Sequence, residues 1–92
     1  MEQQTVNQTR VKILGEDHII AGNESSEYMT LIGEYVDRKM REFQKGRPYL
    51  SHYKIAVLTA LNLADELTKL QNDYDELLQQ MEEKEAANDR KE

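Results

Sequence analysis

From Ser51 to its last residue, this 92-residue chain contains neither Gly nor Pro, and this feature constrains its fold more than any other. Ser51 can cap a helix, because its hydroxyl can accept a hydrogen bond from one of the free amide groups of the first turn. A helix over 51–87 would be about 55 Å long at 1.5 Å per residue. That is longer than a globule of this size needs, so part of the helix is expected to lie outside any core.

The predicted helix has two parts. Between Ile55 and Leu63 it is apolar nearly all round, which suits a segment packed on more than one side. Along its whole length, apolar residues also recur at alternating spacings of three and four for about four heptads, the signature of a coiled coil. This row, which we call the seam, consists of Tyr53, Ala56, Ala60, Leu63, Leu67, Leu70, Tyr74, Leu77 and Met81.

The seam has two interpretations: it packs on the chain's own domain, or it packs on a partner helix. Residues 1–50 are too few to cover both the apolar first part and a seam that continues for several more turns. Each large apolar side chain left in water would lose about 1.5–3 kcal/mol of burial free energy. We therefore predict a partner helix, most simply from an identical chain. Parallel, antiparallel and four-helix arrangements remain open.

The first residues predict a β-hairpin. Apolar and polar residues alternate from Thr9 to Leu14, as in a half-buried strand. Gly15-Glu16-Asp17 supplies turn chemistry, and His18–Ala21 is the predicted second strand. A hairpin alone is unstable in water, so a helix is expected to cover one of its faces.

That helix is predicted to begin at one of three capping residues, Asn23, Ser25 or Ser26, and to end before Gly46 and Pro48. Its apolar residues form a broad face. They are Tyr28, Met29, Leu31, Ile32, Tyr35, Val36, Met40 and Phe43.

The fold class predicted is therefore α+β: an N-terminal β-hairpin, one amphipathic helix, and a long C-terminal helix that forms an intermolecular coiled coil. The predicted organisation is a disordered tail over 1–8, a dimerising globular region over 9–65, a coiled-coil extension over 66–86 and a disordered charged tail over 87–92.

The net charge of −6 is concentrated in 51–92, which carries five basic and ten acidic residues. An acidic protein repels the phosphate backbone, so nucleic acid is not expected as a partner. The middle of the chain nevertheless holds a local group of cations that could meet an acidic protein surface, or that could simply be the solvated face of a helix. This basic cluster consists of Arg38, Lys39, Arg41, Lys45 and Arg47.

The sequence contains no recognisable membrane span, metal site or catalytic motif. No apolar run approaches the roughly 20 residues that a span requires, and no signal peptide is visible. The absence of Cys excludes thiolate metal sites and fits a reducing compartment such as the cytoplasm. His18 and His52 are too few for a metal constellation, and no phosphate-binding loop or nucleophile motif occurs. We predict a non-enzymatic protein without a cofactor and without membrane insertion.

Four segments carry a resemblance to a known family: Val11-Lys12-Ile13-Leu14-Gly15, Gly22-Asn23-Glu24-Ser25-Ser26, Asp37-Arg38-Lys39-Met40-Arg41-Glu42 and Ala56-Val57-Leu58-Thr59-Ala60-Leu61-Asn62. Asp65-Glu66-Leu67 and the seam follow them. In this order, over roughly residues 9–80, the chain resembles the ZapA family of bacterial cell-division proteins, which associate with the FtsZ ring. The version here resembles the Bacillus-like branch of that family.

The resemblance implies a cytoplasmic, non-enzymatic partner of the tubulin-like protein FtsZ. Family members pair through head and helix into homodimers, and dimers can join through their coiled coils into homotetramers. Their heads bind FtsZ and promote and bundle its filaments at the mid-cell division ring during septation. In some members a basic residue after the glycine of the first hairpin has been linked to FtsZ contact; this chain has Glu16 there. That contact is therefore not transferred to this chain.

Two other functions are compatible with parts of the pattern. A dimeric ribbon-helix-helix DNA-binding regulator also has a strand followed by two helices, but the second strand, the acidic charge and the long seam count against it. A generic coiled-coil adaptor for another partner is the second alternative.

Overall fold

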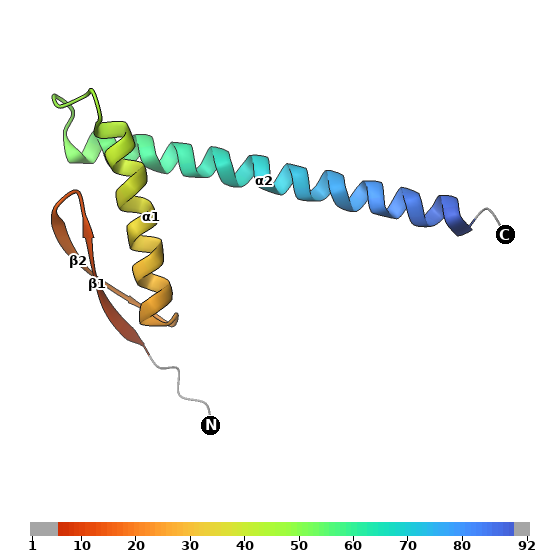
Figure 1. The fold of residues 1–92 in the computed structure, drawn as a ribbon, viewed down its shortest axis with the longest axis horizontal. Helices are drawn as coiled ribbons and strands as arrows, with labels where there is room; N and C mark the ends of the chain where they lie inside the picture. Colours follow the sequence, from red (N-terminus) through yellow and green to blue (C-terminus); the bar gives the residue numbers. More distant parts are fainter. Residues whose placement is uncertain (1–5, 90–92) are drawn as a thin grey trace. The chain divides into compact units, whose positions relative to one another are not determined.

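The computed structural model describes residues 6–89, with side chains to residue 87, as a β-hairpin followed by two helices (Figure 1). The elements are β1 (Asn7–Ile13), β2 (Glu16–Gly22), α1 (Ser26–Gln44) and α2 (His52–Asp89). This is the α+β order that the sequence predicts, with the second helix much the longer at 38 residues.

The hairpin turn lies one residue earlier than the sequence pattern indicates. Ile13 pairs with Glu16, so the loop consists of only Leu14 and Gly15, and Glu16 and Asp17 belong to β2. Leu14 has φ +49° and Gly15 has φ +79°. Two successive residues with positive φ make the type I′ turn that matches the twist of an antiparallel pair. The predicted turn at Gly15-Glu16-Asp17 was wrong. The sequence pattern starts the turn at its glycine, whereas the turn starts one residue earlier, at Leu14, which adopts a positive φ although it is not a glycine.

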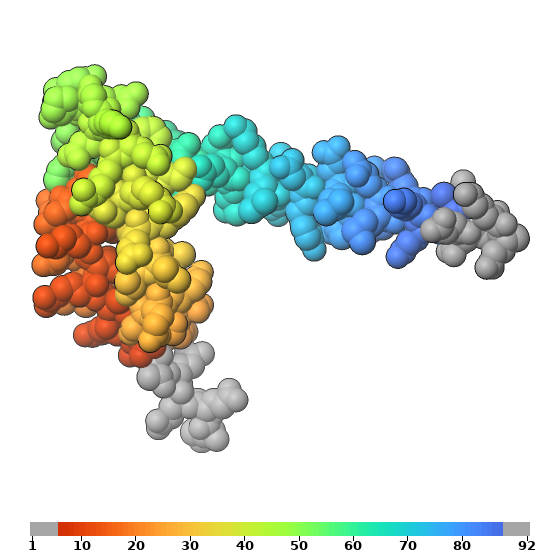
Figure 2. Space-filling model, in the orientation of Figure 1, coloured from red at the N-terminus to blue at the C-terminus, as the bar shows by residue number. Residues whose placement is uncertain are grey.

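The alternation in the first strand gives the hairpin a buried face and an exposed face. Thr9 and Val11 are buried, whereas Arg10 and Lys12 are exposed. α1 covers the buried face, and Figure 2 shows its side chains lying against those of the hairpin. The approach is close at Gly33, where an added Cβ would lie 2.6 Å from Val11 Cγ1. Gly33 therefore sets the distance between α1 and β1.

The ends of α1 follow local capping rules. Of the predicted caps, Ser25 is the one used: its hydroxyl accepts a hydrogen bond from the Tyr28 amide at 3.1 Å. At the other end, the Lys45 amide donates to the Arg41 carbonyl, and Gly46 follows with φ +78°, the left-handed conformation that commonly ends a helix.

α2 begins where Ser51 predicts, since the Ser51 hydroxyl accepts a hydrogen bond from the Lys54 amide at 3.1 Å. The helix then continues to Asp89, so residues 87–89 are helical rather than disordered, because no residue in this stretch interrupts the hydrogen-bond ladder. Residues 90–92 of the predicted charged tail lie outside the described residues. Over the described residues, neither helix combines the length and apolar composition that a membrane crossing requires.

The N-terminal tail is also shorter than predicted. Asn7 and Gln8 belong to β1, and the Asn7 side-chain amide donates to the Glu24 carbonyl at 2.8 Å. The predicted tail over residues 1–5 lies outside the described residues.

The chain divides into two compact units, Met1–Thr59 and Ala60–Glu92, which we call the head and the extension. The sequence pattern places this boundary at residue 65, whereas in the structure it falls after Thr59. Among the described residues, the buried apolar side chains all lie in the head: Val11, Met29, Met40 and Ile55. Ile55, in the first turn of α2, is fully buried.

Candidate functional site

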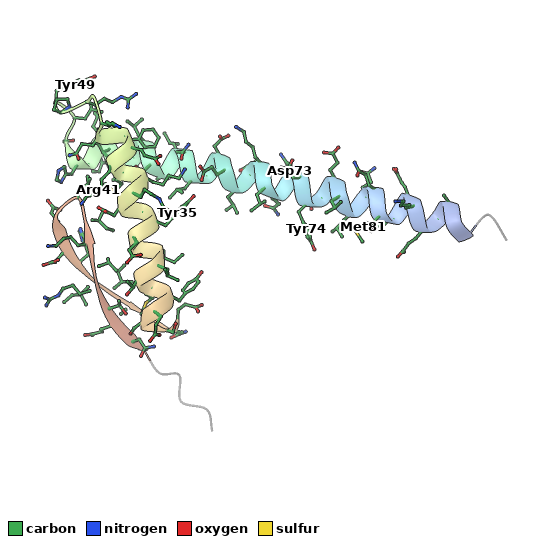
Figure 3. The ribbon with its side chains drawn as sticks, in the orientation of Figure 1. Tyr35, Arg41, Tyr49, Asp73, Tyr74 and Met81 are labelled. Carbon is green, nitrogen blue, oxygen red and sulfur yellow. The ribbon has the colours of Figure 1, made fainter. Side chains whose placement is uncertain are left out.

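The extension exposes the seam at Ala60 and from Leu67 onward, whereas Leu63 is half-buried. From Leu67 to residue 87, every described side chain is exposed. Figure 3 shows Tyr74 and its neighbour Asp73 leaving α2 on different sides, as the helical pattern requires. The exposed fractions of the seam residues here are 64% for Leu67, 67% for Leu70, 61% for Tyr74, 54% for Leu77 and 54% for Met81. The apolar row therefore exists on the surface of α2, and the coiled coil itself remains a prediction.

The start of the seam belongs to the head. Tyr53 is 77% exposed, and Ala56 is exposed as well. Next to them, the Ile55 and Thr59 side chains are buried in the head. The buried Thr59 hydroxyl has a hydrogen-bond partner, since it donates to the Ile55 carbonyl at 2.8 Å. In this part α2 thus has one face in the core of the head and a neighbouring face in solvent.

A second exposed apolar face lies on α1. The buried residues of the helix are Met29, Gly33 and Met40, of which Gly33 lies against Val11 of β1. The remaining apolar side chains of the broad face are left in solvent, with exposed fractions of 50% for Tyr28, 64% for Leu31, 45% for Ile32 and 37% for Tyr35. The broad apolar face predicted for this helix is therefore only partly covered, because the two-stranded sheet is too narrow to span it.

An open groove of about 520 Å³ lies beside the hairpin within the head. Its apolar wall comes from both strands, α1 and the first turns of α2, through Ile13, Ile20, Met40, Tyr53 and Ala56. Ile20 is 38% exposed because α1 packs mainly on β1. The groove and the start of the seam are thus adjoining parts of one apolar surface.

Both histidines lie at the rim of this groove, on either side of Glu16. His52 Nδ1 is 3.3 Å from Glu16 Oε1, and His18 Nε2 is 3.9 Å from Glu16 Oε2. All three side chains are about half exposed, so these contacts are weakened by solvent. Among the described side chains, no group of three or more His, Cys, Asp or Glu residues could hold a metal ion.

The basic cluster is not a uniform patch. Arg38 and Arg41 share one face of α1 by their spacing, whereas Lys39 falls on another face, and Lys45 and Arg47 follow the last helical residue. The Arg38 guanidinium lies 5.4 Å from the centre of the Tyr35 ring, and Arg47 Nη1 donates to the Phe43 carbonyl at 3.1 Å. The five cations that the sequence groups together therefore have different surroundings.

Asp37 enters the sequence pattern only as part of a family motif, without a role of its own. Its Oδ1 atom accepts the Leu14 amide at 2.8 Å, and its Oδ2 atom accepts Arg41 Nε at 2.8 Å (Figure 3 shows Arg41 near the tip of the hairpin). The pKa of the Asp37 carboxyl group lies below its ordinary value of 3.8, chiefly because the Leu14 amide stabilises the charged form. Arg41 lowers this pKa further, and partial burial opposes both effects.

The same order of elements and motifs is found in a known protein family. The family model for the cell division protein ZapA matches residues 9–91. The chain belongs to the ZapA family. The family match confirms the resemblance that the sequence motifs carry. The resemblance to the Bacillus-like branch is confirmed as well, since the relatives come from Bacillus and Geobacillus.

Two relatives show how much of the chain the similarity covers. The cell division protein ZapA of Geobacillus sp. strain WCH70 is 41% identical over 81 residues, which are 88% of this chain and 93% of that protein. The ZapA of Bacillus subtilis strain 168 is 42% identical over 76 residues, which are 83% of this chain and 89% of that protein.

A solved structure is similar as well. A ZapA mutant dimer from Geobacillus stearothermophilus has a TM-score of 0.69 and 39% identity, covering 89% of this chain and 95% of that one. ZapA is a family of cell division proteins, and a catalytic activity is not part of that description. The similarities give no support to a ribbon-helix-helix regulator or a generic adaptor.

Proposed function

We propose that this chain is a non-enzymatic regulator of cell division that binds FtsZ in the cytoplasm, at the mid-cell division ring. It self-associates into a homodimer and, through the seam, into a homotetramer. The resulting set of heads promotes assembly, crosslinking and bundling of FtsZ filaments. Membership of the ZapA family and the dimeric state of the similar structure support this proposal.

The observation that carries the proposal is the exposed part of the seam, from Leu67 to Met81. Five large apolar side chains, each more than half exposed, follow one another at heptad spacing on α2, which is the element that the described part of the extension contains. Burying each of them would contribute about 1.5–3 kcal/mol. Pairing with the same row of an identical chain buries all five at once, with no further segment needed.

Self-association supplies the mechanism of bundling. A single head needs only weak affinity for a filament if a second head of the same particle is already bound, because the linked head then acts at a high effective concentration. Heads held on one particle can bind different filaments and so join them. The basic cluster is the proposed contact with an acidic surface of FtsZ, since it is the local excess of positive charge in an acidic chain.

The test is to break the seam and leave the head intact. Leu70→Glu with Leu77→Glu places two charges in the seam, and we expect the particle mass from light scattering to fall to smaller species. FtsZ pelleting in the presence of GTP should still bring the variant down, whereas light scattering of the filaments should show little bundling.

The matched control is Asn72→Glu with Gln79→Glu. These positions have the same spacing of seven residues and receive the same added charge, but they lie on the side of the helix opposite the seam. The control should keep the wild-type mass and bundling. Undiminished bundling by the seam variant, with its mass reduced, would refute crosslinking, and absence of the wild-type protein from the FtsZ pellet would refute the proposed partner.

A further inference from the structure

The carboxylate of Asp37 joins two parts of the head that are far apart in the sequence. Through Oδ1 it holds the Leu14 amide of the hairpin turn, 23 residues away, and through Oδ2 it holds Arg41 one helical turn further along α1. Both distances are 2.8 Å, and the Asp37 side chain is only 20% exposed. Each oxygen of this carboxylate thus accepts a hydrogen bond from a different element, Oδ1 from the hairpin and Oδ2 from α1.

The turn requires such a partner. Leu14 adopts φ +49°, a left-handed conformation that is unfavourable for a residue with a branched side chain. Its amide also lies in the two-residue loop, outside the ladder that pairs Ile13 with Glu16. A charged acceptor on α1 satisfies this amide and stabilises the turn in the conformation that the hairpin needs.

The same carboxylate sets the orientation of a cation in the basic cluster. Arg41 Nε donates a hydrogen bond to Asp37 Oδ2, although the Arg41 side chain remains 61% exposed. This hydrogen bond restrains the guanidinium plane on the face of α1 that Arg41 shares with Arg38 by helical spacing.

We propose that Asp37 is a positioning residue of the partner-binding surface, which couples the hairpin turn to the basic cluster by holding Leu14 and Arg41 with one carboxylate. Its effect on binding is opposite to what its charge alone would give. A negative charge within a cluster that meets an acidic partner should weaken binding, so its removal should strengthen binding if charge decides the outcome. If positioning decides the outcome, its removal weakens binding. The part of this proposal that concerns FtsZ rests on the proposed function.

Two variants separate charge from position. Asp37→Asn and Asp37→Ala remove the same charge, but Asn keeps an oxygen that can accept the Leu14 amide, and Ala does not. We expect Asp37→Ala to weaken co-sedimentation with FtsZ about tenfold, the order of a lost hydrogen bond to a charged group, and Asp37→Asn to weaken it less. Leu14 amide hydrogen exchange, followed by NMR, should become faster in the same order, with the particle mass unchanged.

Two controls complete the experiment. Glu34→Gln removes a negative charge from the same helix, one turn before Arg38, at an exposed position, and should leave Leu14 exchange unchanged while binding stays equal or becomes tighter. Leu14→Gly in the Asp37→Ala background should restore binding in part, because glycine adopts a positive φ without strain.

The pH dependence gives a readout within the wild-type protein. The groups facing the carboxylate are the Leu14 amide from the hairpin and the Arg41 guanidinium from α1. Because the pKa of Asp37 is lowered in the folded state, the interaction is present above pH 3.8 and is lost as the pH falls through the lower, folded pKa. The Leu14 amide proton shift should therefore titrate with a midpoint below 3.8.

Equal tightening of FtsZ binding by Asp37→Asn and Asp37→Ala, or Leu14 exchange unaffected by Asp37→Ala, would overturn the proposal. If the wild-type chain does not bind FtsZ at all, the proposed function fails, and the exchange and titration of the Leu14 amide still decide whether Asp37 holds the turn.

Discussion

The head and the extension use the same kind of sequence pattern with opposite results. In the head, two residues of the apolar face of α1, Met29 and Met40, are 6% and 7% exposed because the rest of the head packs over them. In the extension, Leu67 and Leu70 also belong to an apolar row on one side of a helix, and they are 64% and 67% exposed. The sequence of an amphipathic helix therefore indicates which face is apolar, and the surrounding chain decides whether that face is buried.

α2 makes this comparison within a single helix. Ile55 in its first turn is fully buried, and Leu70 further along is among the more exposed apolar residues of the chain. Local propensity is not the difference, because both residues stand in uninterrupted helix. The hairpin and α1 cover the first part, whereas the apolar side chains of the extension are exposed, and the proposed partner helix would cover them. The mechanism proposed for the protein depends on this division.

The largest expected effect separates these two positions. Ile55→Ala should lower the free energy of unfolding by about 2–5 kcal/mol, since it leaves a cavity in the core of the head. Leu70→Ala should leave the head as stable as before at high dilution and instead shift self-association to higher protein concentration. Urea unfolding followed at several concentrations measures both. Equal losses for the two variants at the lowest concentration would break the distinction between head and extension.

A smaller effect is expected at Gly33, where the head depends on a close approach. Alanine would gain about 1 kcal/mol in helix propensity, but its Cβ would lie within 2.7 Å of both Val11 Cβ and Val11 Cγ1. Relief of that overlap requires the backbones to move apart, at a typical cost of about 1–3 kcal/mol or more. We expect net destabilisation in urea unfolding, and Glu34→Ala, at the next and exposed position, serves as the control. A stabilised Gly33→Ala variant would mean that α1 and β1 are not held at this distance.

The smallest effect concerns the cap of α1. Ser25→Ala removes the acceptor of the Tyr28 amide and should cost about 1 kcal/mol in the free energy of unfolding. Ser25→Asp keeps an acceptor and should restore the wild-type value, as measured by thermal unfolding at matched concentrations. The two variants would behave alike if the cap hydrogen bond contributed nothing to the head.

The turn and the basic cluster show where sequence reasoning fell short. Glycine and acidic residues after Ile13 indicated a turn, but not which residues form it, because Leu14 is an improbable residue for positive φ. The signal was Asp37, whose carboxylate supports that conformation from α1 and also engages Arg41. A cluster read along the sequence counts charges, whereas only the fold shows that one of its cations is already paired.

The sequence by itself determined the order of the elements, the Ser51 cap of α2 and the seam, and narrowed the cap of α1 to three residues, because capping and periodicity depend on residues within a turn or two of one another. Its motifs also indicated the family. The tertiary structure decided which apolar residues are buried, where the hairpin turns, and that Asp37 holds both Leu14 and Arg41. These outcomes depend on contacts between residues distant in the chain, such as the 23-residue separation of Leu14 and Asp37. The distances across such contacts follow from packing, and no local pattern encodes them.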